Sequence, residues 1–442
     1  MALTAAVDVT ERTPELPEDT HTVELLFTDN HGVLRGKSVP AKQWARVANE
    51  GIAVSSAALI WGVRCELRDT SPAGGMAEGF PDVQLVPLFD TLRPVPWRSG
   101  VVQFMCEIET MAGEASPLSA RNALKAVLDR STALGYEVKA ATEMEFYLLD
   151  PATKRPLGTE VNCYGIADSS GYSKAITNIQ RSLDDYGIPI EACNYEYAPG
   201  QFEINLRYEN AMEACDHAVL LRGAVKELAL DHGLLATFMG KPFGELSGSG
   251  MHVHQSLWRD GVNMFADGQH QRLTQLGYHY LGGLQRRIRE LTLFGSPTLN
   301  DYKRRKDNSF CPTRETWGYD NRTVALRVIT AGNSVRIEQR DASADCNPYL
   351  LLAGQVAAGL EGIELGIDPP EACSGDSYTD TNTRSLPTTV LQAIDLLEAS
   401  DFARTALPAL LVDTHIDTSR WEYNLLTDDV SQLERDRYIG VL

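Results

Sequence analysis

Three short segments of the sequence place charged or imidazole side chains at every second position: Glu143-x-Glu145, His252-x-His254 and Arg336-x-Glu338-x-Arg340. This alternation predicts strands, because successive side chains on a strand point to opposite faces of a sheet. A fourth segment adds Glu196 and Glu203. If one sheet holds all four segments, its surface carries groups that would be costly to bury without ions. The pattern therefore indicates a site for divalent cations and a polyanion such as a nucleotide.

The acidic and imidazole side chains form one candidate ligand set: Glu143, Glu145, Glu196, Glu203, His252 and Glu338. Oxygen-rich sets suit Mg²⁺ or Mn²⁺, and the single imidazole makes Mn²⁺ a plausible substitute for Mg²⁺. The set would serve about two ions, which can polarise phosphoryl oxygens and align the phosphates of ATP. The alternative for a single Glu-x-Glu pair is a solvated strand face, but here four such segments occur together.

Glycines and arginines add to this set. Glycines in the segment Gly248–His254 let the backbone approach a ligand closely. Planar guanidinium groups bind phosphate and carboxylate through paired hydrogen bonds. Five arginines lie near the alternating segments: Arg304, Arg322, Arg327, Arg336 and Arg340. The basic run 302–306 is typical of a solvated loop, but its context favours a phosphate-handling loop.

The elements that must position these residues fall into two parts. Strand and turn patterns fill residues 22–92, and a helical pattern at 118–134 follows a turn near Gly113. Beyond it we predict strands at 139–149 and 196–208, helices at 175–187 and 209–233, and packing helices at 386–400 and 428–440. The fold class is α+β, with domains at 20–112 and 113–442. The loops 158–172 and 303–319 are polar enough to carry function.

The bulk composition narrows the class of protein. The chain has 442 residues, a formal net charge of −20 and eight cysteines without a C-x-x-C pair. Acidity excludes nonspecific nucleic-acid binding, and no apolar run could cross a membrane. The cysteine pattern favours reduced thiols, and residues 1–20 lack the features of a secretory signal. We therefore expect a cytoplasmic protein whose N-terminal residues form a loose leader.

From about Thr22 to its end, the sequence resembles the glutamine synthetase family. Six motifs carry the resemblance in order: TEMEFYLL, NYEYAPGQFEINL, KPFGELSGSGMHVHQSL, NDYKRR, WGYDNRTVALR and VRIEQRDASADCNPYL. The resemblance implies an N-terminal β-grasp domain and a catalytic domain in which an antiparallel sheet with flanking helices forms a funnel. It also implies a homo-oligomer with active sites between neighbouring subunits, expected as a dodecamer of two hexameric rings.

The resemblance also implies roles for individual residues. Metal ligands near the amino-acid substrate would be Glu145, Glu196 and Glu203, and those near the nucleotide would be Glu143, His252 and Glu338. Glutamate would meet Gly248, Arg304 and Arg340, and the nucleotide phosphates would meet Arg322 and Arg327. The rest of the ATP pocket would comprise Glu191, Tyr208, His254, Ser256 and Arg336. The implied reaction phosphorylates the γ-carboxylate of glutamate and then replaces the phosphate with a nitrogen nucleophile, while the loop 305–312 closes over the site.

Departures from the family pattern concern the nitrogen nucleophile. Ammonia-using relatives carry a glutamate in the closing loop, where this chain has Phe310, and an aspartate in a neighbour's β-grasp loop, where segment 53–65 has no acid. A phenyl ring cannot act as a base. We therefore expect an apolar pocket for an organic amine, formed by Phe310, Tyr164 and a neighbouring subunit's Trp61. In addition, Arg384 stands where some relatives carry an adenylylated tyrosine, so that control is expected to be absent.

Other interpretations stay open from the sequence. Phe310 could merely pack, with Glu66 or Asp82 replacing the missing acid, which would make the protein an ammonia-dependent glutamine synthetase. A phosphotransferase on the related guanidino-kinase fold and a structural assembly without activity are further alternatives. The leading hypothesis is an ATP-dependent glutamate–amine ligase of unknown amine preference, assisted by Mg²⁺ or Mn²⁺.

Overall fold

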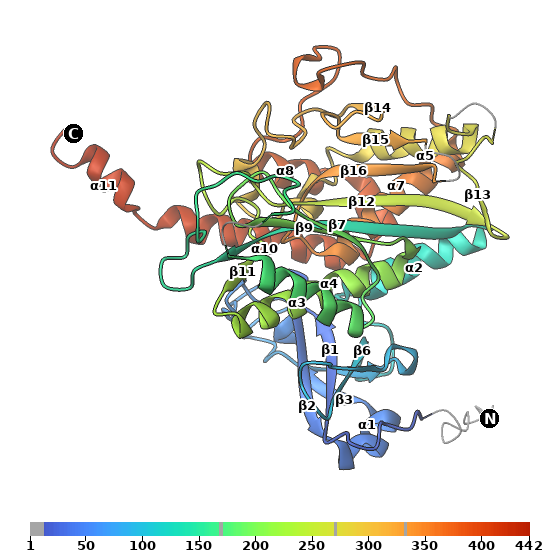
Figure 1. The fold of residues 1–442 in the computed structure, drawn as a ribbon. Coiled ribbons are helices and arrows are strands. Elements are labelled where there is room, and N and C mark those ends of the chain that lie inside the picture. Colours follow the sequence, from blue (N-terminus) through green and yellow to red (C-terminus); the bar gives the residue numbers. More distant parts are fainter. Residues whose placement is uncertain (1–12, 168–170, 269–271, 331–333) are drawn as a thin grey trace.

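A computed structural model of the chain describes residues 13–167, 171–268, 272–330 and 334–442, and it contains two β-sheets with flanking helices (Figure 1). The first sheet has the order β2-β1-β6-β4-β3, in which β1 and β6 run parallel. Its strands are β1 (Thr22–Thr28), β2 (Leu34–Pro40), β3 (Ile52–Ser55), β4 (Asp82–Pro87) and β6 (Val101–Thr110), with β5 (Arg93–Pro94) beside β6. Helix α1 (Trp44–Glu50) packs on this sheet through buried Trp44, whose ring stacks on Phe104.

The second sheet carries the alternating segments found in the sequence. Its order is β14-β15-β16-β12-β7-β9-β8, and of these neighbours only β14 and β15 pair in parallel. The strands are β7 (Glu137–Leu149), β8 (Ile190–Tyr195), β9 (Gln201–Leu206), β12 (Gly250–Arg259), β14 (Trp317–Tyr319), β15 (Leu326–Ile329) and β16 (Arg336–Ser343). Three short strands attach to it: β10 (Glu209–Asn210), β11 (Leu235–Thr237) and β13 (Val262–Asn263). The predicted α+β class with an antiparallel catalytic sheet is confirmed.

Helices cover one side of the second sheet, as Figure 1 shows for α2, α4 and α7. The helices of this part are α2 (Ala120–Ala133), α3 (Ser173–Asp185), α4 (Ala211–Asp231), α5 (Gln275–Arg287), α6 (Thr292–Gly295), α7 (Pro348–Leu365), α8 (Val390–Glu398), α9 (Asp401–Ala406) and α10 (Ala409–Asp428). Helix α7 is buried along nearly its whole length, so it forms the centre of the core. Because the apolar faces of sheet and helices meet there, the opposite side of the sheet is left for polar side chains.

The predicted helices at 118–134, 175–187 and 209–233 correspond to α2, α3 and α4. Gly135 and Gly187 follow the first two of these helices with positive φ angles of 84° and 81°, as glycines at helix ends often do. The strand predicted at 196–208 was only partly right. A turn at 196–200 joins β8 to β9, because Pro199 and Gly200 interrupt the ladder, and this turn carries Glu196.

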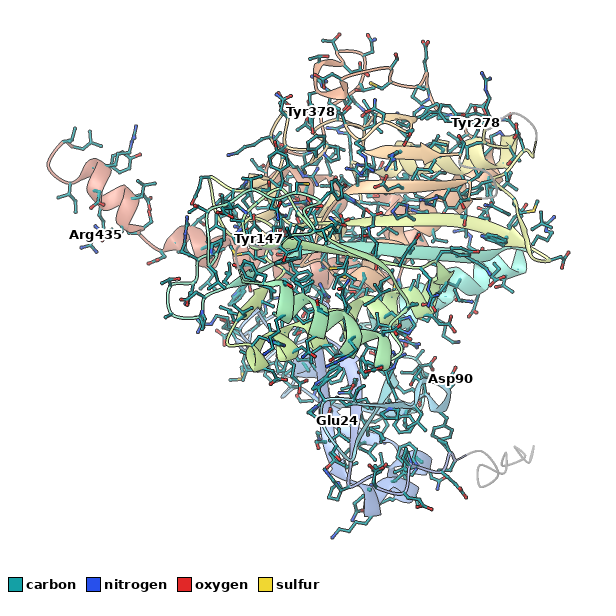
Figure 2. The ribbon with its side chains drawn as sticks, in the orientation of Figure 1. Glu24, Asp90, Tyr147, Tyr278, Tyr378 and Arg435 are labelled. Atoms are coloured by element: carbon teal, nitrogen blue, oxygen red, sulfur yellow. The ribbon has the colours of Figure 1, made fainter. Side chains whose placement is uncertain are left out.

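The last helix, α11 (Gln432–Tyr438), stands away from the rest of the protein, and Figure 2 shows its Arg435 far from the sheets. Helix α11 has no buried residue, and Leu433, Ile439 and Leu442 in and after it are 76%, 73% and 99% exposed. The prediction that residues 428–440 pack onto the fold was therefore wrong within a single chain.

The remaining expectations concern membrane-spanning helices, the domain limits and the N-terminal leader. None of their helices combines the length and apolarity that a bilayer crossing requires. The domain limits 20–112 and 113–442 stay a prediction, and residues 1–12 of the expected leader lie outside the described residues.

Candidate active site

Strand pairing brings the alternating segments together on one face of the second sheet. Glu143 on β7 lies opposite His252 on β12, and Glu338 on β16 lies opposite His254. On the other side of β7, Glu145 lies opposite Glu203 on β9. Directly opposed side chains in antiparallel strands are close neighbours, so the register alone forces these groups into contact.

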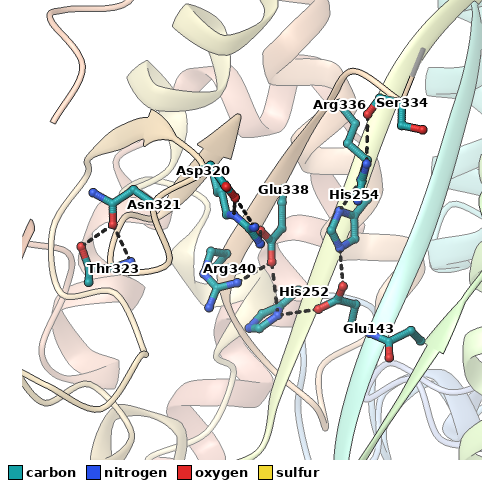
Figure 3. Close-up of polar contacts among 12 residues, drawn as sticks. Glu143, His252, His254, Asp320, Asn321, Thr323, Ser334, Arg336, Glu338 and Arg340 are labelled. Atoms are coloured by element: carbon teal, nitrogen blue, oxygen red, sulfur yellow. Dashed lines mark hydrogen bonds and ion pairs between the residues drawn. The ribbon is translucent and has the colours of Figure 1, made fainter. Parts of the chain in front are cut away.

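Glu143 is the central acceptor of this surface (Figure 3). His252 Nδ1 lies 3.1 Å from one carboxylate oxygen of Glu143, and His254 Nε2 lies 2.9 Å from the other. Burial favours the neutral carboxyl group, but hydrogen bonds from both imidazoles outweigh it and hold the pKa of Glu143 well below its ordinary value. Arg336 Nε donates to His254 Nδ1 at 3.1 Å, so Nδ1 accepts and Nε2 is the nitrogen that faces Glu143.

Glu338 is fully buried and joins the two histidines to two arginines. His252 Nδ1 lies 3.4 Å from Glu338, Arg327 donates to its carboxylate at 3.2 Å, and Arg340 makes a short hydrogen bond to it. Burial opposes ionisation, yet the positive charge of Arg340 keeps the pKa of Glu338 low. Arg327 is also held by Asp320, whose side chain is 78% exposed. Both arginines are thus fixed beside the cluster before any ligand binds.

The second acidic group consists of Glu145, Glu196 and Glu203. Burial, reinforced by Glu196, raises the pKa of Glu145 to about 7. Burial and the neighbouring carboxylates raise the pKa of Glu203 to about 9. Glu196 is positioned by its turn, where Tyr197 N donates to it at 3.2 Å. Where carboxyl groups raise one another's pKa values, a bound cation relieves their repulsion, so cation binding is accompanied by proton release.

The donor set therefore fits divalent metal ions. Two triplets each bring three ligand atoms within 4.8 Å of one another, Glu143 with His254 and Glu338, and Glu143 with Glu203 and His252. All six predicted metal ligands lie on this face or beside it, and His254, predicted for the ATP pocket, joins the first triplet. Oxygen donors with one or two imidazoles suit Mg²⁺ or Mn²⁺.

A cavity of about 370 Å³ opens on the Glu145 side of the cluster. Its lining includes five predicted residues, Glu145, Gly248, His252, Arg304 and Arg340, and the predicted amine-site residue Phe310. Sequence reasoning missed Lys241, which also lines it. Burial, with Lys306 and Arg304 nearby, lowers the pKa of Lys241.

Arg304 is the main anion-binding candidate in this cavity. Its side chain is 5% exposed, and Nη1 donates to Ser343 Oγ at 2.8 Å. Among the residues that the structure describes, no carboxylate oxygen lies within 4.0 Å of a guanidinium nitrogen of Arg304, the distance that defines an ion pair. A buried guanidinium group without a bound anion is costly, so this residue is arranged to receive one. Gly248 is required here, because a Cβ atom would lie 2.5 Å from Arg304 Cγ.

Phe310 lies at the mouth of the same cavity. Its ring is 58% exposed, and its φ angle of 57° is unusual for a residue with a side chain. Asn308 has a similar φ of 61°, so the loop holds two strained residues next to the cavity. The remaining lining at this end includes apolar Val161, Pro199 and Leu246.

Three predicted residues, Tyr164, Arg322 and Trp61, lie outside this cavity and belong to neither of the two ligand triplets. Tyr164 is 66% exposed and close enough to Arg322 and Glu196 for their charges to act on its hydroxyl group, although burial is what chiefly raises its pKa. Arg322 is exposed. Trp61 packs against the hydrophobic core of the first sheet, where its Nε1 donates to Asp29 at 3.3 Å. The roles assigned to these side chains stay predictions.

A larger cavity of about 820 Å³ opens on the Glu143 side of the cluster. It is lined by five of the six residues predicted to bind ATP: Glu191, Tyr208, His254, Ser256 and Arg336. The sixth, Arg327, lies beside Glu338 instead. Trp258 and Lys139 were missed: Trp258 stacks on Tyr208 with centroids 5.9 Å apart, and Lys139 Nζ lies 5.0 Å from the Trp258 ring. The signal was present, because the alternation of His252 and His254 continues through Ser256 to Trp258.

Comparisons with known proteins agree with this geometry. Residues 117–438 match the family described as glutamine synthetase, catalytic domain. A glutamate–isopropylamine ligase from a Pseudomonas species is 35% identical over 437 residues, which cover 95% of each chain. A γ-glutamylethanolamide synthetase from Streptomyces coelicolor is 33% identical over 98% of this chain and 97% of its own. The solved structure of GmaS with ADP superposes with a TM-score of 0.85 at 31% identity, covering 96% of this chain and 97% of that one.

Proposed function

Because the chain belongs to the glutamine synthetase family, we propose that it joins the γ-carboxyl group of glutamate to an organic amine, using ATP and a γ-glutamyl phosphate intermediate. The observation that carries the choice of amine over ammonia is the place of Phe310, at the mouth of the cavity that holds Arg304 and Arg340. An aromatic ring there offers contact to an alkyl group and no base for ammonium. The names of two relatives, which specify isopropylamine and ethanolamide chemistry, point the same way.

The two cavities assign the substrates to opposite sides of the acidic cluster. ATP would enter the larger one, with its base near Tyr208 and Trp258 and its phosphates toward His254 and Arg336. Glutamate would occupy the smaller one, with a carboxylate on Arg304. The γ-carboxylate and the γ-phosphate would then meet at the cluster between the cavities, and phosphoryl transfer requires these two groups to be held next to each other.

Divalent cations held by Glu143, Glu145, Glu196, Glu203, His252 and Glu338 would neutralise the phosphates and act as Lewis acids. Arg327 and Arg340 are already fixed beside Glu338, so their donors need little rearrangement to stabilise charge on the transferring phosphoryl group. The loop 305–312 would exclude water from the acyl phosphate, and Phe310 would hold the amine's carbon chain. The amine nitrogen attacks the γ-carbonyl carbon, and phosphate leaves.

We also propose that the protein acts in the cytoplasm as a ring-shaped oligomer, expected as a dodecamer of two hexamers. All eight cysteines are free, as expected for a reducing compartment. The exposed apolar residues of α11 lack partners within the chain, and burial against a second copy would provide them.

The test is ADP release with glutamate and a panel of alkyl, hydroxyalkyl, aromatic and polyamines, compared with ammonium at equal concentration. At least one amine should give a higher kcat/KM than ammonium, and the product should be its γ-glutamyl amide by mass spectrometry. Faster turnover with ammonium than with every amine would instead establish an ammonia-dependent glutamine synthetase.

A further inference from the structure

Two carboxyl groups, each with a buried Oδ1 atom, lie directly behind Arg304. Asp301 begins the turn that leads into Arg304, and Asp345 follows the end of β16. Asp301 is 0% exposed, and its Oδ2 accepts hydrogen bonds from Thr298 N at 2.8 Å and Thr298 Oγ1 at 2.9 Å. Asp345 Oδ2 accepts from Gly240 N at 3.2 Å. Neither residue belongs to the metal cluster or lines a cavity described above.

Gly240 marks the point where these groups meet the arginine. A Cβ atom there would lie 2.5 Å from Asp301 Oδ1, 3.1 Å from Ser343 Oγ and 3.3 Å from Arg304 Cδ. The absence of a side chain thus allows the acid, the serine and the guanidinium stem to pack around one backbone position. The Oδ1 atoms of Asp301 and Asp345 are both buried. Among the described residues, no N–H group or hydroxyl group donates a hydrogen bond to either atom.

Burial of the two carboxyl groups disfavours the state in which both are ionised. Burial raises the pKa of Asp301 well above its ordinary value, and the neighbouring Asp345 adds to the effect. Burial also raises the pKa of Asp345, which is hydrogen-bonded to Asp301. A proton between two carboxyl groups explains this contact, since two ionised oxygens would only repel each other.

We propose that Asp301 and Asp345 share one proton and together act as a positioning device, whose single negative charge orients Arg304 while leaving its donors free for the carboxylate of glutamate. This inference rests on the proposed function, because it assumes that Arg304 binds that substrate.

The charge count explains why one proton matters. With the proton shared, the pair balances one buried guanidinium charge and does not compete with the substrate for it. Without the proton, two negative charges would draw Arg304 toward the pair and away from the cavity. The other charged or titratable groups that act on the pair are Arg222 and Lys226 on α4 and Cys346 beside Asp345. Since the arginine and lysine are cationic, they stabilise the negative charge that remains on the pair.

The test uses Asp345→Asn and Asp301→Asn in the metal-loaded protein. In either variant an amide N–H can donate to the remaining carboxylate, so the single charge persists without a titratable proton. The dissociation constant of glutamate, measured by calorimetry, should stay within about threefold of wild type at pH 7. In wild type this constant should rise at alkaline pH, by up to roughly tenfold per pH unit, whereas both variants should stay flat.

Infrared spectra give a readout that does not depend on turnover. The metal-loaded wild type should show the carbonyl stretch of a protonated carboxyl group, and both variants should lack that band. Asp341→Asn is the matched control, because this buried carboxylate accepts from Gln339 at 2.8 Å and is not part of the pair. The control should keep both the band and the alkaline rise.

Two results would overturn the proposal: no such band in wild type, or an alkaline rise that survives in Asp345→Asn. Equal weakening of ATP and glutamate binding in both variants would also overturn it, since that would show a structural role. If wild type ligates no amine, the proposed function fails on its own, while glutamate binding and the infrared band still test the pair.

Discussion

Glu145 on β7 and Glu203 on β9 stand directly opposite each other, and both carboxyl groups have raised pKa values. Burial comes first for both groups; the charge of Glu196 adds to it at Glu145, and several neighbouring carboxylates add to it at Glu203, which puts the pKa values near 7 and 9. The pair is therefore stable when protonated and needs a cation when ionised. This relationship makes the stability of the candidate metal site depend on pH.

The first prediction follows from that pair. Both carboxyl groups have a higher pKa in the folded protein than in the unfolded chain, where the pKa is near 4.5. Each group therefore stabilises the fold fully at a pH below 4.5, and this stabilisation is lost as the pH rises through the folded-state pKa values near 7 and 9. The melting temperature of the metal-free protein should therefore fall between pH 5 and 9. Saturating Mn²⁺ should remove the decline, and calorimetry in buffers of different ionisation enthalpy should detect proton release on binding.

Glu203→Gln tests whether these carboxyl groups cause the fall in melting temperature with rising pH. It should flatten the pH dependence of the metal-free melting temperature, weaken Mn²⁺ binding and lower kcat by at least about 100-fold. Glu114→Gln, a change at an exposed position outside the site, should alter none of these. A metal-free protein whose stability rises from pH 5 to 9 would show that the two carboxylates are not buried together.

Phe310 is predicted to select the amine. Phe310→Glu should reduce kcat/KM for apolar amines by about tenfold and raise activity with ammonium, because a carboxylate replaces apolar contact and supplies a base. Phe310→Leu keeps the apolar surface and should keep the amine preference. Competition assays with both nucleophiles measure the ratio directly, and an unchanged ratio in Phe310→Glu would mean that the amine binds elsewhere.

Arg304→Lys should raise the KM for glutamate by about 10- to 100-fold, because a buried charge-assisted hydrogen bond contributes about 1.5–3 kcal/mol. The KM for ATP should change little, since Arg304 lies on the other side of the cluster from the nucleotide cavity. Initial-rate measurements with each substrate varied in turn separate the two constants. Equal changes in both would contradict the assignment of the smaller cavity to glutamate.

Removal of residues 429–442 should change assembly and not folding, because no residue of α11 is buried in the chain. Sedimentation should show a smaller particle than the full-length protein, with unchanged helix content by circular dichroism. Leu433→Ser combined with Ile439→Ser tests the same surface without truncation. A truncated protein of unchanged particle size would assign the contacts between copies to another surface.

The sequence by itself determined the chemistry and the local structure that carries it. Alternating Glu143 and Glu145, or His252 and His254, can share a face only on a strand, and the helices α2, α3 and α4 were readable from their apolar periodicity and terminal glycines. These signals are local, because they depend on side chains within a few positions of one another. The place of Phe310 in the closing loop was also predicted from the family motifs.

Only the tertiary structure decided which of these residues meet. Strand register placed Glu203 against Glu145 and made His254 a neighbour of Glu338, and no pattern within either strand specifies its partner. Strands β14, β15 and β16 lie between Asp301 and Asp345 in the sequence, so their contact behind Arg304 had no sequence signal. Long-range contacts depend on how the core packs as a whole, which is why the alternating strands could be predicted and the arrangement of their side chains could not.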